Sequence, residues 1–213
     1  NKLSNGIYAK DLVLHIINKL GVNAGVGYAY EFAGPAISSL SMEERMTICN
    51  MSIEGGARCG YINPDEITFN YLKDRLCSPQ NKNWDKAIKW WESLKSNENS
   101  VFDDIVNIDA SKVEPTVTWG ITPGQSIAIN QKIPSLKELN PNDQFIANEA
   151  YEYMGFKPGQ TIKNTPIDVC FIGSCTNGRI SDLRVAAKIL EHHKVAENVK
   201  AFVVPGSEKV AKE

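Results

Sequence analysis

Apolar residues recur at spacings of three and four along several stretches of the chain, which is the period of an amphipathic helix. Residues 9–20 carry such a face and end at Gly21, a natural helix terminator. A second helix is predicted to begin after Ser41, because Glu44 three residues later completes a capping box. We expect the buried stripe of this second helix to consist of Met42, Met46, Cys49, Ile53 and Ala57.

A row of polar residues follows the same predicted helix. Asn50, Glu54 and Arg58 stand four positions apart, so they would share one face. The row is either solvated, with a Glu54–Arg58 ion pair, or a functional face with a carboxamide and a carboxylate one turn apart. Gly55 and Gly56 favour the second interpretation, because a glycine inside a helix costs about 1 kcal/mol relative to alanine.

Three more helices are predicted further along the chain. The first begins at Asn63, with Asn63 as its cap, and its buried side would be Phe69, Leu72 and Leu76. The adjacent acids Asp65 and Glu66 are interpreted as structural, since neighbouring helical residues point apart. The apolar stripe of residues 84–91 predicts the second helix, and residues 143–154 predict the third, ended by Gly155.

Short apolar runs predict strands between these helices. They span residues 28–32, 104–109, 116–119, 126–129, 167–172 and 201–204. One helix lies between the last two strands, which predicts a right-handed parallel β-α-β unit with its two polar loops side by side. The predicted fold class is therefore α/β. Pro, Asn and Lys are frequent in residues 131–142, so we place the domain boundary there, giving domains 1–130 and 131–213.

One cysteine occupies a chemically distinctive position in the predicted β-α-β unit. Cys175 follows the strand and precedes the helix, for which Ser181 is the expected N-cap. Partial positive charge at a helix N-terminus favours a thiolate there. Three roles stay open from position alone: a redox or nucleophilic thiol, a ligand of a metal or iron–sulfur cluster, or a small buried side chain. Cys170 lies inside the apolar run and is expected to belong to the core.

Composition excludes several classes of protein. The 213 residues carry a net charge of −2 without a basic block, which argues against a nucleic-acid-binding surface. No apolar run approaches the roughly 20 residues of a membrane-spanning helix, and no signal peptide is visible. Five cysteines without a C-x-x-C motif predict reduced thiols in a cytoplasmic compartment and no complete zinc or cluster site. The chain starts without Met and stops inside a predicted helix, so we expect a piece of a longer protein.

Five stretches of the chain, in order, resemble the aconitase superfamily. Around Cys175 the stretch Phe171-Ile-Gly-Ser-Cys-Thr-Asn-Gly-Arg179 is similar to the first iron–sulfur motif of that family. The other four are Tyr30-Glu-Phe-Ala-Gly34, Met46-Thr-Ile-Cys-Asn-Met-Ser-Ile-Glu-Gly-Gly-Ala-Arg58, Pro64-Asp-Glu-Ile-Thr-Phe69 and Val117-Thr-Trp-Gly-Ile-Thr-Pro-Gly-Gln125. The resemblance covers nearly the whole chain, and it is greatest to the isopropylmalate-isomerising branch.

The resemblance implies a fold, a cofactor and site residues. The fold would be aconitase-like α/β/α domains with parallel or mixed sheets, incomplete here. The intact enzyme would be a hydro-lyase with a [4Fe–4S] cluster, with Cys175 as one metal ligand and Asn177 and Arg179 in the cofactor-binding loop. Asn50 and Glu54 match the family's catalytic pair, and Glu54 would hold a hydroxyl or water on a Lewis-acidic iron.

The resemblance also implies a reaction and a partner. The enzyme would convert 2-isopropylmalate to 3-isopropylmalate in leucine biosynthesis, together with a separate small subunit. The remaining cluster cysteines, the base and the substrate clamps have no counterpart here, so we expect this piece alone to hold no stable cluster. Two alternatives stay open: another hydro-lyase of the family, acting on homoaconitate or citrate, and a non-catalytic RNA- or partner-binding module.

Overall fold

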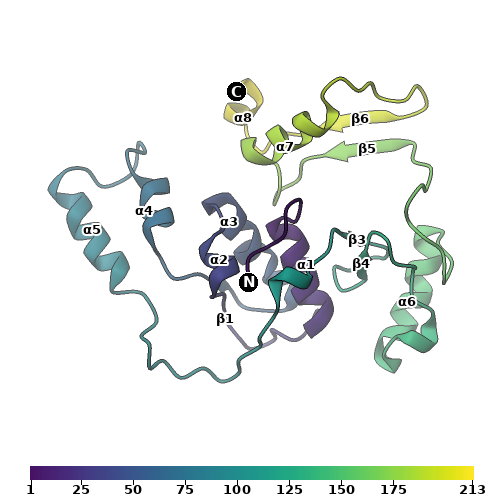
Figure 1. Cartoon of the computed structure of the whole chain (residues 1–213), viewed down its shortest axis with the longest axis horizontal. Coiled ribbons are helices and arrows are strands. Elements are labelled where there is room, and N and C mark those ends of the chain that lie inside the picture. Colours follow the sequence, from purple (N-terminus) through teal and green to yellow (C-terminus); the bar gives the residue numbers. More distant parts are fainter. The chain divides into compact units, whose positions relative to one another are not determined.

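The chain folds into two compact units, Asn1–Pro115 and Thr116–Glu213. The computed structural model describes residues 1–213, apart from the side chain of Asn142. Both units combine helices with short two-stranded sheets, parallel in two cases and antiparallel in one (Figure 1). The predicted α/β class is confirmed. The predicted domain boundary between residues 130 and 131 stays a prediction.

The first unit is mainly helical, with one small parallel sheet. Its 3₁₀ turns are Ile53–Gly55 and Ala110–Lys112. Its helices and strands are α1 (Ala9–Leu20), β1 (Tyr30–Glu31), α2 (Pro35–Ser38), α3 (Met42–Met51), β2 (Gly60–Tyr61), α4 (Glu66–Leu72) and α5 (Lys82–Glu92). Tyr30 pairs with Gly60 in this sheet, and Glu31 with Tyr61.

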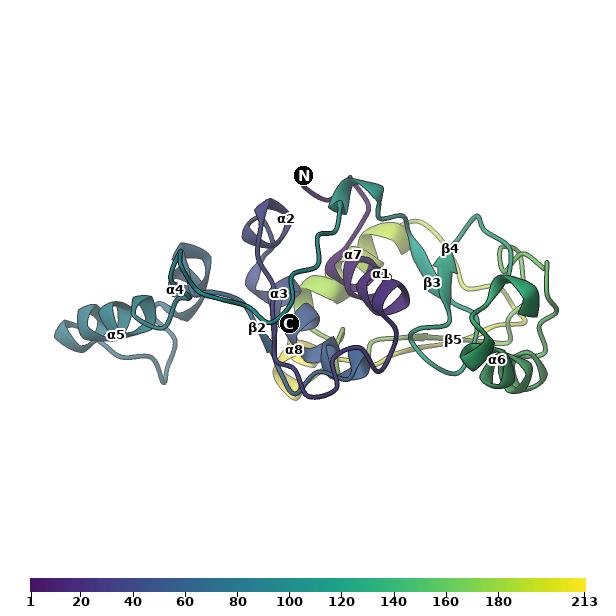
Figure 2. The ribbon, with the colours of Figure 1, turned by 90° about the horizontal axis from the view of Figure 1, so that it is seen from below.

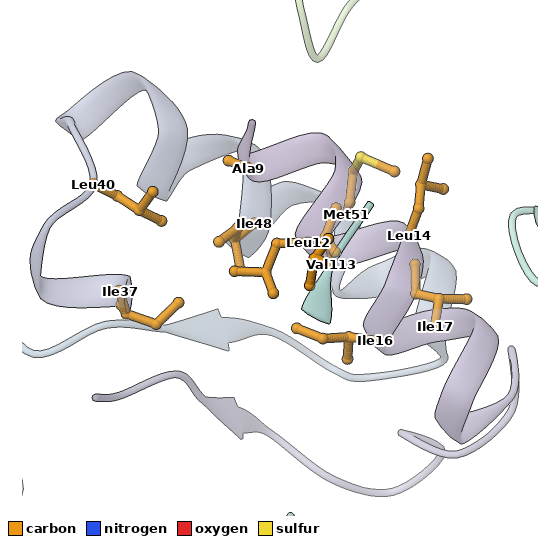
Figure 3. Close-up of a cluster of buried hydrophobic side chains, with 11 residues drawn as sticks. Ala9, Leu12, Leu14, Ile16, Ile17, Ile37, Leu40, Ile48, Met51 and Val113 are labelled. Carbon is orange, nitrogen blue, oxygen red and sulfur yellow. The ribbon is translucent and has the colours of Figure 1, made fainter. Parts of the chain in front are cut away.

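The core of the first unit lies between α1 and α3. In Figure 3, Leu12 of α1 and Ile48 of α3 point toward one another, and both side chains are buried. We call this group the α1–α3 core; it consists of Ala9, Leu12, Val13, Leu14, Ile16, Ile17, Ile37, Leu40, Ile48, Met51 and Val113. Each buried aliphatic side chain stabilises the fold by roughly 1.5–3 kcal/mol relative to exposure. The helix predicted over residues 9–20 is confirmed.

The helix predicted to run from Ser41 past residue 57 is shorter than expected. Ser41 and Glu44 form the predicted capping box, with the Ser41 amide donating to Glu44 Oε2 over 2.9 Å. The helix ends at Met51 and is followed by the 3₁₀ turn Ile53–Gly55, which Gly56 closes in a left-handed conformation, φ +85°. The predicted buried stripe was therefore wrong at Ile53, which is 55% exposed, and Met42, Met46 and Cys49 are only half-buried. The buried residues of α3 are Arg45, Thr47, Ile48 and Met51.

A buried ion pair attaches α4 to α3. The Arg45 side chain is 2% exposed, and its Nη1 and Nη2 donate to the two Asp65 carboxylate oxygens over 2.6 and 2.7 Å. Asp65 also accepts from the amides of Ile67 and Thr68, so Asp65 caps α4, and the prediction of Asn63 as cap was wrong. The structural interpretation of Asp65 is confirmed.

Aromatic stacking joins α4 to α5, and the two helices lie side by side in Figures 1 and 2. The Phe69 ring stacks on Trp91 with 6.0 Å between centroids, and Trp84 meets Trp91 edge to face at 5.6 Å. Leu76 was predicted to be buried with Phe69, but it is 99% exposed because α4 ends at Leu72.

The second unit contains both kinds of sheet. Its 3₁₀ turn is Leu136–Glu138. Its helices and strands are β3 (Thr116–Thr118), β4 (Ser126–Ala128), α6 (Pro141–Met154), β5 (Val169–Ile172), α7 (Ile180–Leu190), β6 (Lys200–Val203) and α8 (Glu208–Lys212). β3 and β4 are antiparallel, and β5 and β6 are parallel with α7 between them, which confirms the β-α-β prediction. Gly155 ends α6 in the left-handed conformation, as predicted.

The buried residues of the second unit belong to its first half. Trp119 stacks on Tyr151 of α6 at 5.3 Å, and the Tyr151 hydroxyl donates to the Pro134 carbonyl over 2.6 Å. These two pack with Ile133, Ala147 and Ala150. Among the described residues after Phe156, no apolar side chain is buried. The predictions of buried strands at 167–172 and 201–204 are thus right for the strands and wrong for their burial.

One predicted strand does not form. Residues 101–109 are extended but belong to no sheet. The Ile105 amide donates to the neighbouring Asp104 carboxylate over 2.7 Å, which occupies a donor that a strand would use for pairing. No described helix combines the length and the apolar character needed to cross a membrane.

Candidate functional site

Cys175 lies in the turn that connects β5 to α7, as the sequence predicts. Its side chain is exposed, whereas the next residue, Thr176, is 6% exposed. The Cys175 Sγ and the Thr176 Oγ1 are 3.8 Å apart. An exposed thiol beside a buried neighbour is available to an outside group while its backbone is held in place. The interpretation of Cys175 as a buried side chain is therefore wrong.

Close backbone contact shapes this turn, which we call the Cys175 loop (residues 173–179). Gly173 has a φ of +104°, and a Cβ there would lie 2.1 Å from the Val204 carbonyl oxygen. Further along, the Gly206 amide donates to the Gly178 carbonyl over 2.7 Å. Only glycine at 173 permits this approach. The loops that follow β5 and β6 thus lie side by side, which confirms the prediction.

Polar side chains fix the interior of the Cys175 loop. The Asn177 amide donates to Ser174 Oγ over 3.2 Å, and Arg179 Nη1 donates to the Thr176 carbonyl over 2.7 Å. Asp182 bridges two groups: Oδ1 accepts from Asn177 Nδ2 over 3.2 Å and Oδ2 from the Arg179 amide over 3.1 Å. Asn177 and Arg179 therefore belong to one hydrogen-bonded loop with Cys175.

The capping of α7 differs from the prediction. Ser181 was expected as N-cap, but α7 begins at Ile180 with Arg179 in the cap position. Asp182, in the first turn, accepts from the Arg179 amide and so satisfies the backbone donor of the N-cap residue. Asp182 was not predicted from the sequence, although an acid three residues after a turn is a signal for this contact.

Cys170 lies on the half-buried face of β5. Cys170 and Ile172 are half-buried, and the alternate residues Val169 and Phe171 are 54% and 62% exposed. Cys170 therefore points to the face opposite the exposed one, in accordance with strand alternation. The expectation that Cys170 belongs to a core is met only in part.

Asn50 and Glu54 lie in the first unit, separate from the Cys175 loop. Asn50 belongs to the last turn of α3, and Glu54 to the following 3₁₀ turn; both side chains are exposed. Because the helix ends at Met51, Arg58 is not part of the predicted row. The glycines that favoured a functional face have a structural use: Gly56 packs against the Val22 carbonyl, 3.0 Å from an added Cβ.

Cys49, in the first unit, is half-buried and is less suited to metal binding than the exposed Cys175. Burial, more than the neighbouring Cys59, raises the pKa of the Cys49 thiol, which disfavours the thiolate that a metal needs. No group of three or more His, Cys, Asp or Glu side chains suited to a metal ion occurs among the described residues. Cys175 is exposed and lies in an ordered turn, so its thiol is accessible to a ligand-binding partner.

A small cavity in the first unit does not coincide with the predicted site. It measures about 190 Å³, and its lining includes Phe32, Arg45, Asp65 and Lys95. Arg45 and Asp65 neutralise one another through their ion pair. Neither Asn50 nor Glu54 lines this cavity.

Comparison with known proteins covers the whole chain. A family model described as "Aconitase family (aconitate hydratase)" matches residues 1–213. The chain is 85% identical over 213 residues to a "3-isopropylmalate dehydratase large subunit" of Prochlorococcus marinus (strain MIT 9515), covering 100% of this chain and 45% of the relative. A protein of the same description from Synechocystis sp. (strain ATCC 27184 / PCC 6803 / Kazusa) is 64% identical over 208 residues, covering 98% and 44%. The chain spans less than half the length of these relatives.

Proposed function

The chain belongs to the aconitase family, and we propose that it forms part of the large subunit of a 3-isopropylmalate dehydratase, a hydro-lyase of leucine biosynthesis. The family match over residues 1–213 and the identities of 85% and 64% support this assignment. The structural observation that carries it is the exposed Cys175 thiol on a loop held by glycine contacts and by Asp182.

The reaction is a dehydration followed by rehydration. Water leaves 2-isopropylmalate and re-adds with the hydroxyl group on the neighbouring carbon, which gives 3-isopropylmalate. A [4Fe–4S] cluster, when bound, supplies a Lewis-acidic iron for the hydroxyl and a carboxylate of the substrate. Because the described residues include no group of three or more side chains suited to a metal, the other cluster ligands would belong to the rest of the subunit.

The residues of this chain have separate tasks in the proposal. Cys175 would hold one iron through its thiolate, because its exposed sulfur and fixed backbone suit a ligand. Asn177 and Arg179 would order the loop around the cluster. Asn50 and Glu54 would face the substrate side, where the Glu54 carboxylate orients the departing hydroxyl or the returning water. The base and the substrate clamps would lie mostly outside this chain.

The proposed partner is a small subunit, and the proposed compartment is the cytoplasm. The relatives are described as large subunits, which implies a second chain in their complexes. The chain has a net charge of −2 and no basic block. This charge agrees with an enzyme that acts on a small molecule rather than with a nucleic-acid-binding protein.

The proposal is tested by turnover of the complete large and small subunits on three acids. We expect 2-isopropylmalate to be isomerised with a kcat/KM at least about tenfold above that for homoaconitate or citrate, since a pocket fitted to an isopropyl group gains about 1–3 kcal/mol from its methyl groups. Preferred turnover of homoaconitate or citrate would assign the chain to another branch of the family.

A second test concerns this chain alone. After anaerobic reconstitution with iron and sulfide, we expect iron content far below four per chain and no cluster absorbance in the visible range, because one thiolate cannot replace several. A stoichiometric four-iron cluster in the 213-residue chain would contradict the proposed division of ligands between this chain and the rest of the subunit.

A further inference from the structure

Asp182 lies in the first turn of α7. Among the described contacts, both of its carboxylate oxygens accept hydrogen bonds from residues of the Cys175 loop. Oδ1 accepts from the Asn177 side-chain amide over 3.2 Å, and Oδ2 accepts from the Arg179 backbone amide over 3.1 Å. One hydrogen bond therefore reaches into the loop, and the other satisfies the first turn of the helix. Both are partly buried, which makes them stronger than exposed ones.

The Asn177 amide takes a single orientation because of Asp182. A carboxylate can only accept, so Asn177 must present Nδ2 to it. Asn177 Oδ1 is then turned into the loop, where it is buried without a hydrogen-bond partner among the described groups. A buried acceptor left unpaired costs about 1–3 kcal/mol, so this arrangement needs a group that enforces it. Asp182 is that group.

The hydrogen bonds of Asp182 act on the segment that contains Cys175. Asn177 is bound at its backbone amide to Ser174, the residue before Cys175, and at its side chain to Asp182, so the turn 174–177 is held at both ends. Arg179, whose amide Asp182 accepts, donates its guanidinium to the carbonyl of Thr176, the residue after Cys175. Two paths of contacts thus lead from Asp182 to the residues on either side of the thiol.

We propose that Asp182 is a positioning residue that fixes the direction of the Cys175 thiol through Asn177 and Arg179. Asp182 does not touch the thiol itself. The inference rests on the proposed function for its biological meaning, since a thiol of fixed direction serves a metal cluster. Residues that orient metal ligands commonly change metal affinity by 10–100-fold when they are replaced.

Two substitutions separate positioning from helix capping. In Asp182→Asn one acceptor oxygen becomes an NH₂ donor. The new side chain can then accept from only one of the two groups, Asn177 Nδ2 or the Arg179 amide, and its NH₂ group opposes the other donor. Asp182→Glu keeps the charge and suits a capping box, but the extra methylene displaces the carboxylate from Asn177. Glu138→Gln is the matched control, because Glu138 accepts from the Ser135 amide over 2.7 Å in the same unit without contacting the Cys175 loop.

The test uses the complete large subunit assembled with its small subunit, with two readouts. In the cluster-free complex, the rate of Cys175 alkylation by iodoacetamide is measured by mass spectrometry relative to the exposed Cys77. In the reconstituted complex, the rate of iron loss to a chelator is measured together with the electron paramagnetic resonance spectrum of the reduced cluster. Thermal midpoints are recorded for every variant.

We expect Asp182→Asn and Asp182→Glu to change the Cys175 alkylation ratio at least threefold and to speed iron loss about tenfold, with an altered resonance spectrum. Glu138→Gln should leave all three unchanged. If Asp182→Glu matches the unsubstituted complex in these readouts, Asp182 is only a helix cap and the inference is overturned. If the unsubstituted complex binds no cluster, the proposed function fails, and the alkylation ratio alone decides the inference.

Discussion

The α1–α3 core of the first unit and the β5–α7–β6 segment of the second are ordered by different kinds of interaction. In the α1–α3 core, buried aliphatic side chains such as Val13 and Ile48 are at most 1% exposed and hold two helices together. In the β5–α7–β6 segment no apolar side chain is buried, and Phe171 and Phe202 are 62% and 51% exposed. That segment is held by backbone pairing, by glycine contacts and by the hydrogen bonds of Asp182.

The difference shows how the geometry of the site is produced. A core stabilises through the amount of apolar area that it removes from water, and it tolerates modest changes of shape. The Cys175 loop depends instead on individual contacts, each with a defined direction and distance. Single-atom changes in the loop should therefore alter its geometry without much change in global stability, whereas the reverse should hold for the α1–α3 core.

Gly173→Ala should give the largest effect, because the new Cβ would lie 2.1 Å from the Val204 carbonyl at a φ that alanine disfavours. We expect amide-exchange protection of β5 and β6 to be lost, while α1 and α3 keep theirs. Gly159→Ala is the control: its φ is +79°, but nothing lies within 4 Å of the added Cβ. Equal protection in the two variants would show that the close approach does not hold the loop.

Ile48→Ala should be the largest change in the α1–α3 core. Ile48 is 0% exposed, and removing a buried side chain of this size costs about 2–5 kcal/mol. Phe171→Ala in the uncovered face of β5 should cost less than about 0.5 kcal/mol. Urea denaturation of the two variants provides the comparison. A comparable loss in Phe171→Ala would mean that the β5–β6 face is covered in solution.

Asp65→Asn should destabilise the first unit by about 1–2 kcal/mol, since Arg45 would keep a buried charge with a neutral partner, and the partial exposure of Asp65 screens the loss. Hydrogen bonding from Arg45, followed by smaller contributions, lowers the pKa of Asp65. A lowered folded-state pKa contributes stability above the unfolded value near 3.8 and loses it as pH falls through the folded pKa.

The stability difference between the unsubstituted chain and Asp65→Asn should therefore be constant at neutral pH and should shrink below about pH 4. Chemical denaturation at pH 7, 5, 4 and 3 measures it. A difference that stays the same over this range would show that the ion pair does not depend on the ionised carboxylate.

Ser41→Ala should cost about 1 kcal/mol, through loss of the α3 cap. Ser207→Ala removes the same kind of cap from α8, where Ser207 Oγ accepts from the Val210 amide over 3.2 Å. Because α8 has five residues and no buried side chain, Ser207→Ala should only increase local exchange near residues 208–212. An equal fall in the thermal midpoint for both variants would contradict the difference between the two regions.

The sequence predicted the elements that depend on local patterns. The helix over residues 9–20, the capping box at Ser41 and the parallel pairing of β5 with β6 all follow from periodicity and turn residues. The Cys175 loop was placed correctly between strand and helix for the same reason. Asn50, Glu54, Asn177, Arg179 and Cys175 stay predictions as functional residues.

Other features depend on contacts between distant residues, which periodicity does not contain. Gly56 closes the 3₁₀ turn after α3 in a left-handed conformation, and an added Cβ there would lie 3.0 Å from the Val22 carbonyl oxygen. Asp65 replaces Asn63 as a cap because Arg45 of α3 also binds it. Burial of β5 and β6 was overestimated, because an apolar run indicates that a strand can be buried but does not identify the element that would cover it.

The central claim is that Cys175, on its ordered loop, binds iron, whereas Cys170 in β5 does not. The most direct measurement is the iron and acid-labile sulfide content of the reconstituted complete complex carrying Cys175→Ser or Cys170→Ser. We expect Cys175→Ser to lose the intact four-iron cluster and turnover, and Cys170→Ser to keep both. Retention of a full cluster and activity by Cys175→Ser, or equal loss in the two variants, would contradict the account.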